Sequence, residues 1–348
     1  MANIKDVAKK AGVSVSTVSY ALNGTRPISA ATRQRVMDAA QELNYHPNLL
    51  ARGLINKRTR IIALLYPALF LSLLDDLALE FIASITQVTH QHNYGLLLFT
   101  HKKGEQDIQQ FINQGLVDGI ILMEVLRHDP RTELMKQSGY PFSLIGHSEC
   151  NDGISFVDMD FYTAYRLAVQ HLFDFNHRAI AFLPTIVDVN HPEHNYLYES
   201  IRGFRETVAA LGIQGTIHGC ESTMQGGYEA MKDLLEKQPE VSAAIVGNEL
   251  IYNGASQALR EKGQLVPRDF SMIGVISSRS AEKYSPKITT ISLPAFEMGC
   301  MGTEFLINQL EDPNFKTQQM MLPPQFIVRE STGPVSYTHL RAHETVLD

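Results

Sequence analysis

The long second part of the chain repeats one pattern, in which a short, uninterrupted apolar segment is followed by a stretch with helical periodicity. Apolar segments that do not alternate with polar residues are typical of strands in parallel sheets covered by helices on both faces. Such segments form two series, one at 61–65, 96–99, 119–122 and 142–145, the other at 179–182, 243–246 and 271–274. We therefore predict an α/β body made of two doubly wound lobes with parallel sheets.

Charge is divided unevenly along the 348 residues. The first sixty residues hold ten Lys and Arg against three Asp and Glu, a net charge of +7. The rest of the chain holds twenty Lys and Arg against thirty-four Asp and Glu, a net charge of −14. A basic segment joined to an acidic body indicates one module that meets phosphate and another with a different task.

Two features favour a soluble, intracellular protein. No segment approaches roughly 18 uninterrupted apolar residues, and the first ten residues lack the apolar run of a secretory signal. Cys150, Cys220 and Cys300 are far apart and have no C-x-x-C spacing, which argues against a disulfide framework or a zinc site. We expect a cytoplasmic protein with reduced thiols and no membrane contact.

The basic segment has the pattern of three short helices. Asn3 stands three residues ahead of an acid, a variant of the capping-box signal, and opens the first helix. Gly12 ends that helix, and Ser14 can cap a second one. A third helix is predicted from residue 29 to about residue 44. Two short helices joined by a glycine turn are the helix-turn-helix signature, so residues 1–46 are predicted to form a DNA-binding headpiece.

The second helix of such a motif enters the major groove by its N-terminal part. Its outward side chains Val15, Ser16 and Tyr20 are predicted to face base edges. Short donors around them suit phosphate, and these position the helix rather than specify sequence. The remaining predicted DNA-binding residues of the headpiece are Ser14, Thr17, Ser19, Asn23 and Arg26. The alternative for any one of the polar residues is that it only solvates a small helical bundle.

Specific motifs continue along nearly the whole chain. They comprise residues 4–19, 22–23, 32–33, 42–45 and 47–48 in the basic segment, and 157–160, 171–172, 177–180, 202–204, 266–274, 288–291, 297–299 and 329–332 in the body. On these residues the chain resembles the lactose-repressor (LacI/GalR) family of bacterial transcription regulators. The resemblance covers about residues 2–333.

The resemblance implies a periplasmic-binding-protein-like body over residues 60–333. One lobe would comprise about 60–160 and 293–321, and the other about 161–292 and 322–333. Residues 334–348 have no counterpart in the family and resemble a sequencing read-through.

Residues 47–59 are predicted to be a hinge helix and linker. The segment is too short to be stable alone, and Gly53 weakens it further. The resemblance implies that it folds when two copies pair on an operator, where Leu54 enters the minor groove as an apolar wedge. The alternative is that Leu54 is an ordinary linker residue packed on the body.

The resemblance also implies an effector site between the lobes, at the carboxyl ends of the strands. Asp160 and Asn248 match polar residues that contact effectors in relatives. Phe70 and Ser72 lie in a loop, residues 68–74, at the position of a ligand loop in the family. An equally good interpretation of Asp160 is that it caps the N-terminus of a helix. An equally good interpretation of Phe70 is that it packs in the core.

Three positions of that effector site depart from the family, and at one of them Glu249 stands in place of the Asp that usually follows Asn248. Ser200 stands where relatives often carry an Arg, and Ile276 stands where many carry a carboxylate that grips hydroxyls. Their loss removes charged hydrogen bonds worth about 1.5–3 kcal/mol each. The effector is therefore expected to be unusual, weakly bound or absent.

Enzyme signatures are missing from the sequence. It has no dinucleotide-binding or P-loop glycine pattern and no Gly-x-Ser-x-Gly motif, and its closely spaced His pairs are interpreted as surface residues. We predict a dimeric, operator-binding repressor without catalytic residues, metal or cofactor, controlled by a small metabolite of the sugar class. The rival classes are a solute-binding protein, which has no use for the basic segment, and a sugar-modifying enzyme, which needs clustered acids or a nucleophile.

Overall fold

The computed structural model describes residues 2–23, 26–45, 58–66, 76–100, 104–185 and 193–335. The chain divides into two compact units, Met1–Arg60 with Gln114–Asp118, which contains the headpiece, and the remainder, which we call the body. The predictions for Leu54, Phe70 and Ser72 lie outside the described residues, as do those for the Asn23 side chain and for the tail beyond residue 335.

The headpiece contains the three predicted helices, α1 (Ile4–Ala11), α2 (Val15–Asn23) and α3 (Ala30–Glu42). Asn3 Oδ1 accepts the N–H of Lys5 at 2.9 Å and that of Asp6 at 3.3 Å, and the Asp6 carboxylate accepts the Asn3 N–H at 2.9 Å. This completes the predicted capping box. Gly12 adopts φ 65°, the left-handed conformation that ends α1. The core between the helices is made of small side chains, Val7, Ala8, Ala11, Val18, Ala21, Val36, Ala39 and Ala40.

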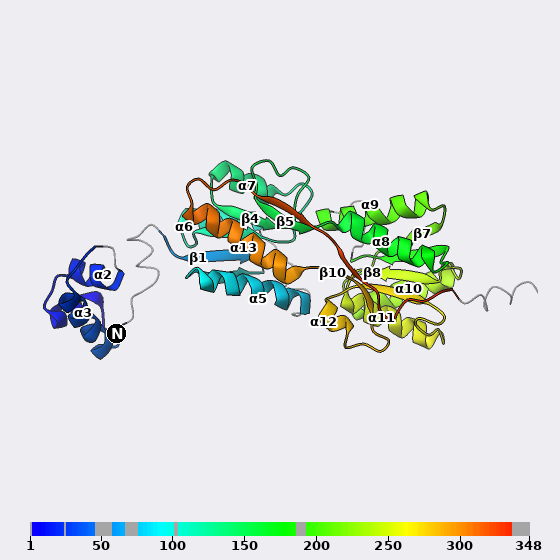
Figure 1. Cartoon of the computed structure of the whole chain (residues 1–348), viewed down its shortest axis with the longest axis horizontal. Coiled ribbons are helices and arrows are strands. Elements are labelled where there is room, and N and C mark those ends of the chain that lie inside the picture. The colour runs from blue at the N-terminus through cyan, green and yellow to red at the C-terminus, as the bar shows by residue number, and fades with distance from the viewer. Residues whose placement is uncertain are drawn as a thin grey trace, which may run out of the picture. The chain divides into compact units, whose positions relative to one another are not determined.

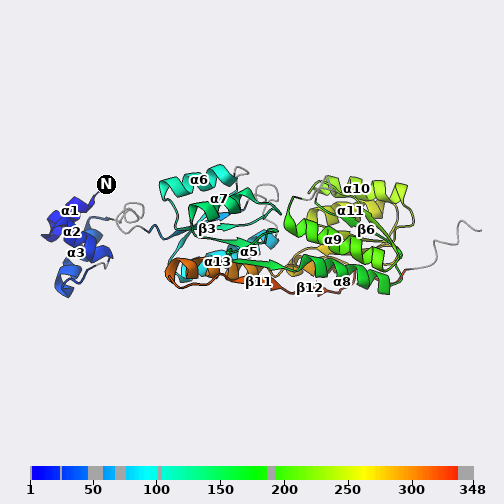
Figure 2. The same cartoon turned by 90° about the horizontal axis from the view of Figure 1, so that it is seen from above.

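The N-terminal lobe of the body is built on a six-stranded sheet ordered β11-β5-β4-β3-β1-β2, and all its neighbouring strands are parallel. The strands are β1 (Ile61–Leu65), β2 (Gly95–Phe99), β3 (Gly119–Leu122), β4 (Phe142–Ile145), β5 (Phe156–Met159) and β11 (Gln319–Leu322). Figure 2 shows α6 (Gly104–Gln114) and α7 (Pro130–Ser138) on one side of this sheet, and α5 (Asp76–Gln91) and α13 (Ala295–Glu311) together on the other. Cover on both faces explains why β3 and β4 are buried throughout.

The C-terminal lobe is built on a second sheet, ordered β12-β10-β9-β8-β6-β7. Its strands are β6 (Ala179–Leu183), β7 (Gln214–Ile217), β8 (Ala243–Val246), β9 (Ser271–Val275), β10 (Thr289–Ser292) and β12 (Gln325–Ile327). Helices α8 (Phe161–Asp174) and α9 (Asn195–Ala210) cover one face, and α10 (Met224–Lys237) and α11 (Glu249–Glu261) cover the other, with the short α12 (Ser278–Ala281) beside them (Figure 1). The sheet is parallel except for β12, which runs antiparallel to β10 at one edge.

Three connections cross between the lobes, after β5, after β10 and after β11. Leu322, which the prediction assigned to the second lobe, is the last residue of β11 in the first sheet, so the third crossing lies at Pro323 and Pro324. The return through these two residues lays β12 on the second sheet from the opposite direction, which is why this edge departs from the predicted parallel order. In the part of the chain that the structure describes, no helix is long and apolar enough to cross a membrane.

Candidate functional site

The second helix of the headpiece presents the predicted base-reading side chains outward. Val15 is 41% exposed and Ser16 is also exposed, whereas Val18 on the opposite side of α2 is fully buried. Tyr20 is half-buried, and the Arg26 guanidinium lies 5.1 Å from the centroid of its ring. A cation over an aromatic face holds that ring in place. The N-terminal part of α2 is accessible, as docking in a major groove requires.

Hydroxyl groups gather at the start of α2. Ser14 Oγ accepts the Thr17 N–H at 3.1 Å and lies 2.7 Å from Ser16 Oγ and 2.8 Å from Thr17 Oγ1. Ser14 therefore caps α2 as predicted, and its hydroxyl is engaged by the helix itself. Ser19 is half-buried further along the helix. A helix start with hydroxyls and unpaired N–H groups suits a phosphate oxygen.

In the body, a cavity of about 650 Å³ lies between the two lobes. Residues that follow β1, β3, β4, β6, β8 and β9 line it, so it sits at the carboxyl ends of the strands, where open α/β sheets bind ligands. Three of the predicted effector positions meet there, namely Ser200, Asn248 and Ile276. Asp160 does not line the cavity. Its carboxylate accepts the Thr163 N–H at 2.9 Å and caps α8, which is the alternative interpretation of this residue.

The predicted residues of the C-terminal lobe use their polar groups within that lobe. Asn248 Oδ1 accepts the Ile251 N–H at 2.9 Å, and its Nδ2 donates to Ser222 Oγ at 2.6 Å. Ser200 Oγ donates to the Tyr196 carbonyl at 2.7 Å. Ile276 contributes only apolar surface. The polar groups of Ser200 and Asn248 are therefore already engaged within their own lobe.

The charged residues of the cavity were missed by the sequence analysis. Asp129, Arg131 and Asp158 are buried charged residues, and all three line this cavity. Such side chains are almost never buried unless paired, and buried charges cluster at functional sites. Asp129 and Arg131 follow a predicted buried strand, 119–122, only after several residues, and nothing adjacent to them in the sequence indicates that they are buried.

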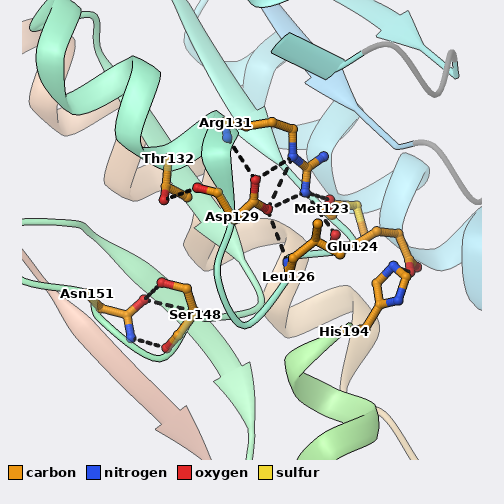
Figure 3. Close-up of polar contacts among 9 residues, drawn as sticks. All are labelled: Met123, Glu124, Leu126, Asp129, Arg131, Thr132, Ser148, Asn151 and His194. Carbon is orange, nitrogen blue, oxygen red and sulfur yellow. Dashed lines mark hydrogen bonds and ion pairs between the residues drawn. The ribbon is translucent and has the colours of Figure 1, made fainter. Parts of the chain in front are cut away.

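Arg131 and Asp129 form a rigid ion pair at the start of α7. The Arg131 Nε donates to Asp129 Oδ1 at 2.9 Å, and its Nη2 donates to Asp129 Oδ2 at 2.6 Å. The same Nη2 reaches the carbonyls of Met123 and Glu124 at 3.2 and 2.8 Å, and Asp129 also accepts the N–H of Leu126 at 3.1 Å (Figure 3). The guanidinium is thereby fixed against the loop that follows β3.

A second buried pair bridges the two lobes. His147 Nδ1 lies 2.8 Å from Asp158 Oδ2, and His147 Nε2 lies 2.8 Å from Nδ2 of Asn195, the first residue of α9. Burial raises the pKa of the Asp158 carboxyl, and its hydrogen bond with His147 opposes that rise. A neutral His147 that donates to Asp158 and accepts from Asn195 satisfies all three groups. This chain of contacts runs from the first sheet to the second lobe.

Both rims of the cavity are also tied between lobes. On one rim the Arg127 N–H donates to the Glu193 carbonyl at 2.8 Å, and the Arg127 guanidinium lies 3.7 Å from the centroid of the Tyr198 ring. On the other rim Asp76 of α5 accepts from Lys283 Nζ at 2.6 Å and from Ser280 Oγ at 3.1 Å. The hydrogen bond from Lys283 lowers the pKa of Asp76. These contacts hold the lobes closed over the cavity.

Comparisons with known proteins agree with both halves of this description. Residues 3–48 match the model of the bacterial regulatory proteins of the lacI family, and residues 169–332 match that of the periplasmic binding protein-like domain. The ribose operon repressor of Escherichia coli (strain K12) is 29% identical over 339 residues, which cover 95% of this chain and 100% of that protein.

Solved structures extend the likeness. A complex of the transcriptional regulator CelR with cellobiose has a TM-score of 0.70 at 26% identity, over 95% of this chain and 100% of that one. The lac repressor dimer bound to operator has a TM-score of 0.83 over 95% and 99% of the two chains, with 23% identity, and supports the fold. Members of this family are DNA-binding regulators rather than enzymes. Over nearly its whole length the chain is therefore similar to transcription regulators, and it carries the helix-turn-helix domain of the lacI family followed by a periplasmic binding protein-like domain.

Proposed function

We propose that the protein is a dimeric repressor whose headpiece binds operator DNA and whose interlobe cavity binds a small sugar-class metabolite that sets operator affinity. The observation that carries the effector half of this proposal is the cavity of about 650 Å³ lined by the buried charged residues Asp129, Arg131 and Asp158. The named relatives provide the analogy, since one represses a ribose operon and another was solved with cellobiose.

The contacts at the rims indicate how a ligand acts on the body. The lobes cannot rotate apart without breaking the Asp76–Lys283 pair or the contact of Arg127 with Glu193. A ligand that touches both walls adds to the same closed arrangement and shifts the population toward it. A coupling free energy of about 1–3 kcal/mol between ligand and operator is typical of such devices.

Dimerisation follows from how the headpiece reads DNA. A single α2 covers one half-site, so a palindromic operator needs two copies of the chain. Leu79 on α5 and Leu97 and Leu98 on β2 are exposed apolar side chains that supply contact surface on the N-terminal lobe. We retain Leu54 as the minor-groove wedge at the centre of the operator. Because a bacterial regulator meets its operator DNA in the cytoplasm, we place the protein there.

Operator binding by the full chain tests this function. A DNA site selected from a random library should be approximately palindromic and should bind two chains. A metabolite that raises the melting temperature of the body should then change operator affinity by about 5- to 150-fold, as fluorescence anisotropy would measure. A ligand that binds the body and leaves operator affinity unchanged would contradict the effector half, and selection of no palindromic site would contradict the repressor half.

A further inference from the structure

We infer that Arg131, held by Asp129, is the polar anchor of the effector, and that the effector is an uncharged sugar or glycoside rather than a sugar phosphate or a sugar acid. This inference rests on the proposed function, since it concerns the ligand of the same cavity. Three observations carry it: the donors that Arg131 leaves unused, the balance of charge around them, and the aromatic side chains that line the same cavity.

Arg131 has unused donors at the cavity. Its Nε and Nη2 are taken by Asp129 and by the carbonyls of Met123 and Glu124. Its Nη1 forms no hydrogen bond with any described residue (Figure 3). The side chain is 8% exposed, and the residue lines the cavity. A guanidinium carries only donors, so the Nη1 N–H groups can donate to an acceptor on a ligand in the cavity.

The charge around Arg131 selects against an anion. Asp129 already neutralises the guanidinium at 2.6 Å. Arg131 is the one Lys or Arg among the described residues that line the cavity, whereas the same lining includes further carboxylates, those of Glu105, Glu124, Asp158, Glu193 and Glu249. A phosphate or carboxylate would enter a wall with an excess of negative charge and would lose its hydration there. A hydroxyl or ring oxygen accepts the same hydrogen bonds without that cost.

The rest of the cavity suits the apolar face of a sugar ring or an aglycone. Aromatic side chains from both lobes line it, namely Tyr66, Phe81, Phe161, Tyr165, Phe182 and Tyr196. Ile276 adds an apolar side chain on the C-terminal wall. A ligand with one hydroxyl-bearing edge and one apolar face therefore fits the two walls: its edge toward Arg131 and its face toward the rings.

The conservative variant Arg131→Lys tests the anchor without leaving Asp129 unpaired. A lysine keeps the positive charge but offers one nitrogen, which cannot both hold Asp129 and reach the ligand as the guanidinium does. Arg268→Lys is the matched control, because Arg268 pairs with Asp269 at 2.8 Å on the exposed surface, away from the cavity. Both variants are made in the full chain.

The probes are ribose, glucose, cellobiose and an aryl glucoside, set against ribose 5-phosphate, glucose 6-phosphate and gluconate. We expect at least one uncharged probe to raise the melting temperature of the body and the anionic probes not to. For that probe, Arg131→Lys should weaken binding at least about tenfold by calorimetry, while Arg268→Lys binds as the parent chain does and both variants bind the operator normally without ligand.

Two results would overturn the inference. If an anionic probe binds more tightly than the uncharged probes and changes operator affinity, the effector is not an uncharged sugar, and the proposed function still stands. Unchanged probe affinity in Arg131→Lys would refute the anchor. Failure of every probe, charged and uncharged, would count against the inference and against sugar control of operator binding together.

Discussion

The two walls of the interlobe cavity are built differently. The N-terminal lobe contributes the buried charged residues of the cavity, Asp129 paired with Arg131, and Asp158 hydrogen-bonded to the half-buried His147. The C-terminal lobe contributes Asn248 and Ser200, whose polar groups are engaged within that lobe, and the apolar Ile276. Buried ion pairs add little to stability compared with apolar packing. Their confinement to one wall therefore indicates that recognition is assigned to the N-terminal lobe and that the C-terminal lobe closes over the ligand.

The largest expected effect comes from breaking the charged pair of the N-terminal wall. Asp129→Ala leaves the Arg131 guanidinium buried without its partner and should lower the free energy of unfolding of the body by about 3–5 kcal/mol. Chemical denaturation of the full chain would measure the loss. As a control, Glu236→Ala removes the partner of the exposed Lys262 and should cost at most about 1 kcal/mol. Equal losses at the two pairs would mean that the wall of the cavity is no different from the surface.

A buried histidine of the C-terminal lobe tests whether ionisable groups there serve stability instead. His177 contacts Ser242 Oγ at 2.8 Å, Ser271 Oγ at 3.0 Å and the Gly333 carbonyl at 3.1 Å, and it does not line the cavity. Burial lowers the pKa of His177 to about 4 from the ordinary 6.5. Between about pH 6.5 and about pH 4, the unfolded chain therefore binds a proton at this histidine that the folded chain does not bind.

The free energy of unfolding should accordingly fall as the pH drops from about 6.5 to about 4, by up to roughly 3 kcal/mol from this residue. Denaturation at a series of pH values would show the slope. His177→Gln should make this slope smaller and leave ligand affinity unchanged. A smaller slope should remain, because burial also lowers the pKa of His171. Loss of ligand affinity in His177→Gln would contradict the division of roles between the lobes.

Asn195 joins the two walls, so its removal should affect closure more than stability. Asn195→Ala deletes the 2.8 Å contact with His147 and leaves the His147–Asp158 pair within one lobe. We expect ligand affinity to fall by about 5- to 10-fold, the worth of one net hydrogen bond, with little change in the melting temperature of the ligand-free body. Calorimetry and thermal unfolding would separate the two. A large drop in melting temperature without a change in affinity would make Asn195 a structural residue only.

The smallest effect is expected at the exposed rim. Lys283 is 58% exposed in its pair with Asp76, so Lys283→Met should change ligand affinity by no more than the equivalent of about 1 kcal/mol. That change should shrink further at high salt because exposed pairs are screened. A salt series of ligand-binding measurements would check this change. An effect as large as that of Asn195→Ala would show that the Asp76–Lys283 pair contributes to closure as much as Asn195 does.

Much of the fold could be predicted because its signals are local. Strands 119–122, 142–145 and 243–246 were predicted at the bounds that the structure shows, since short segments made almost entirely of apolar residues leave little choice. The edge strand β12 was not, because its three residues carry no pattern and its direction depends on where the chain re-enters the second lobe.

The cavity shows the limit of local signals. Asp129 before Pro130 is a helix-start signal in the sequence, and Asp129 does cap α7. Nothing adjacent to it in the sequence shows that Arg131 turns back onto the same carboxylate and is buried with it. At Asp160 the sequence has two signals at one position, a match to a ligand residue of relatives and a helix-capping signal. The structure supports the cap.

The sequence by itself determined the three-helix headpiece, the two series of strands and the family, because these depend on side-chain periodicity, caps and motifs within a few neighbouring residues. Only the tertiary structure decided which charges are buried, that Arg131, Asp129 and Asp158 meet in one cavity, and that Asn195 bridges the lobes. The physical reason is that burial and pairing of a charge depend on segments far apart in the chain, and their cost or benefit exists only once those segments are packed together.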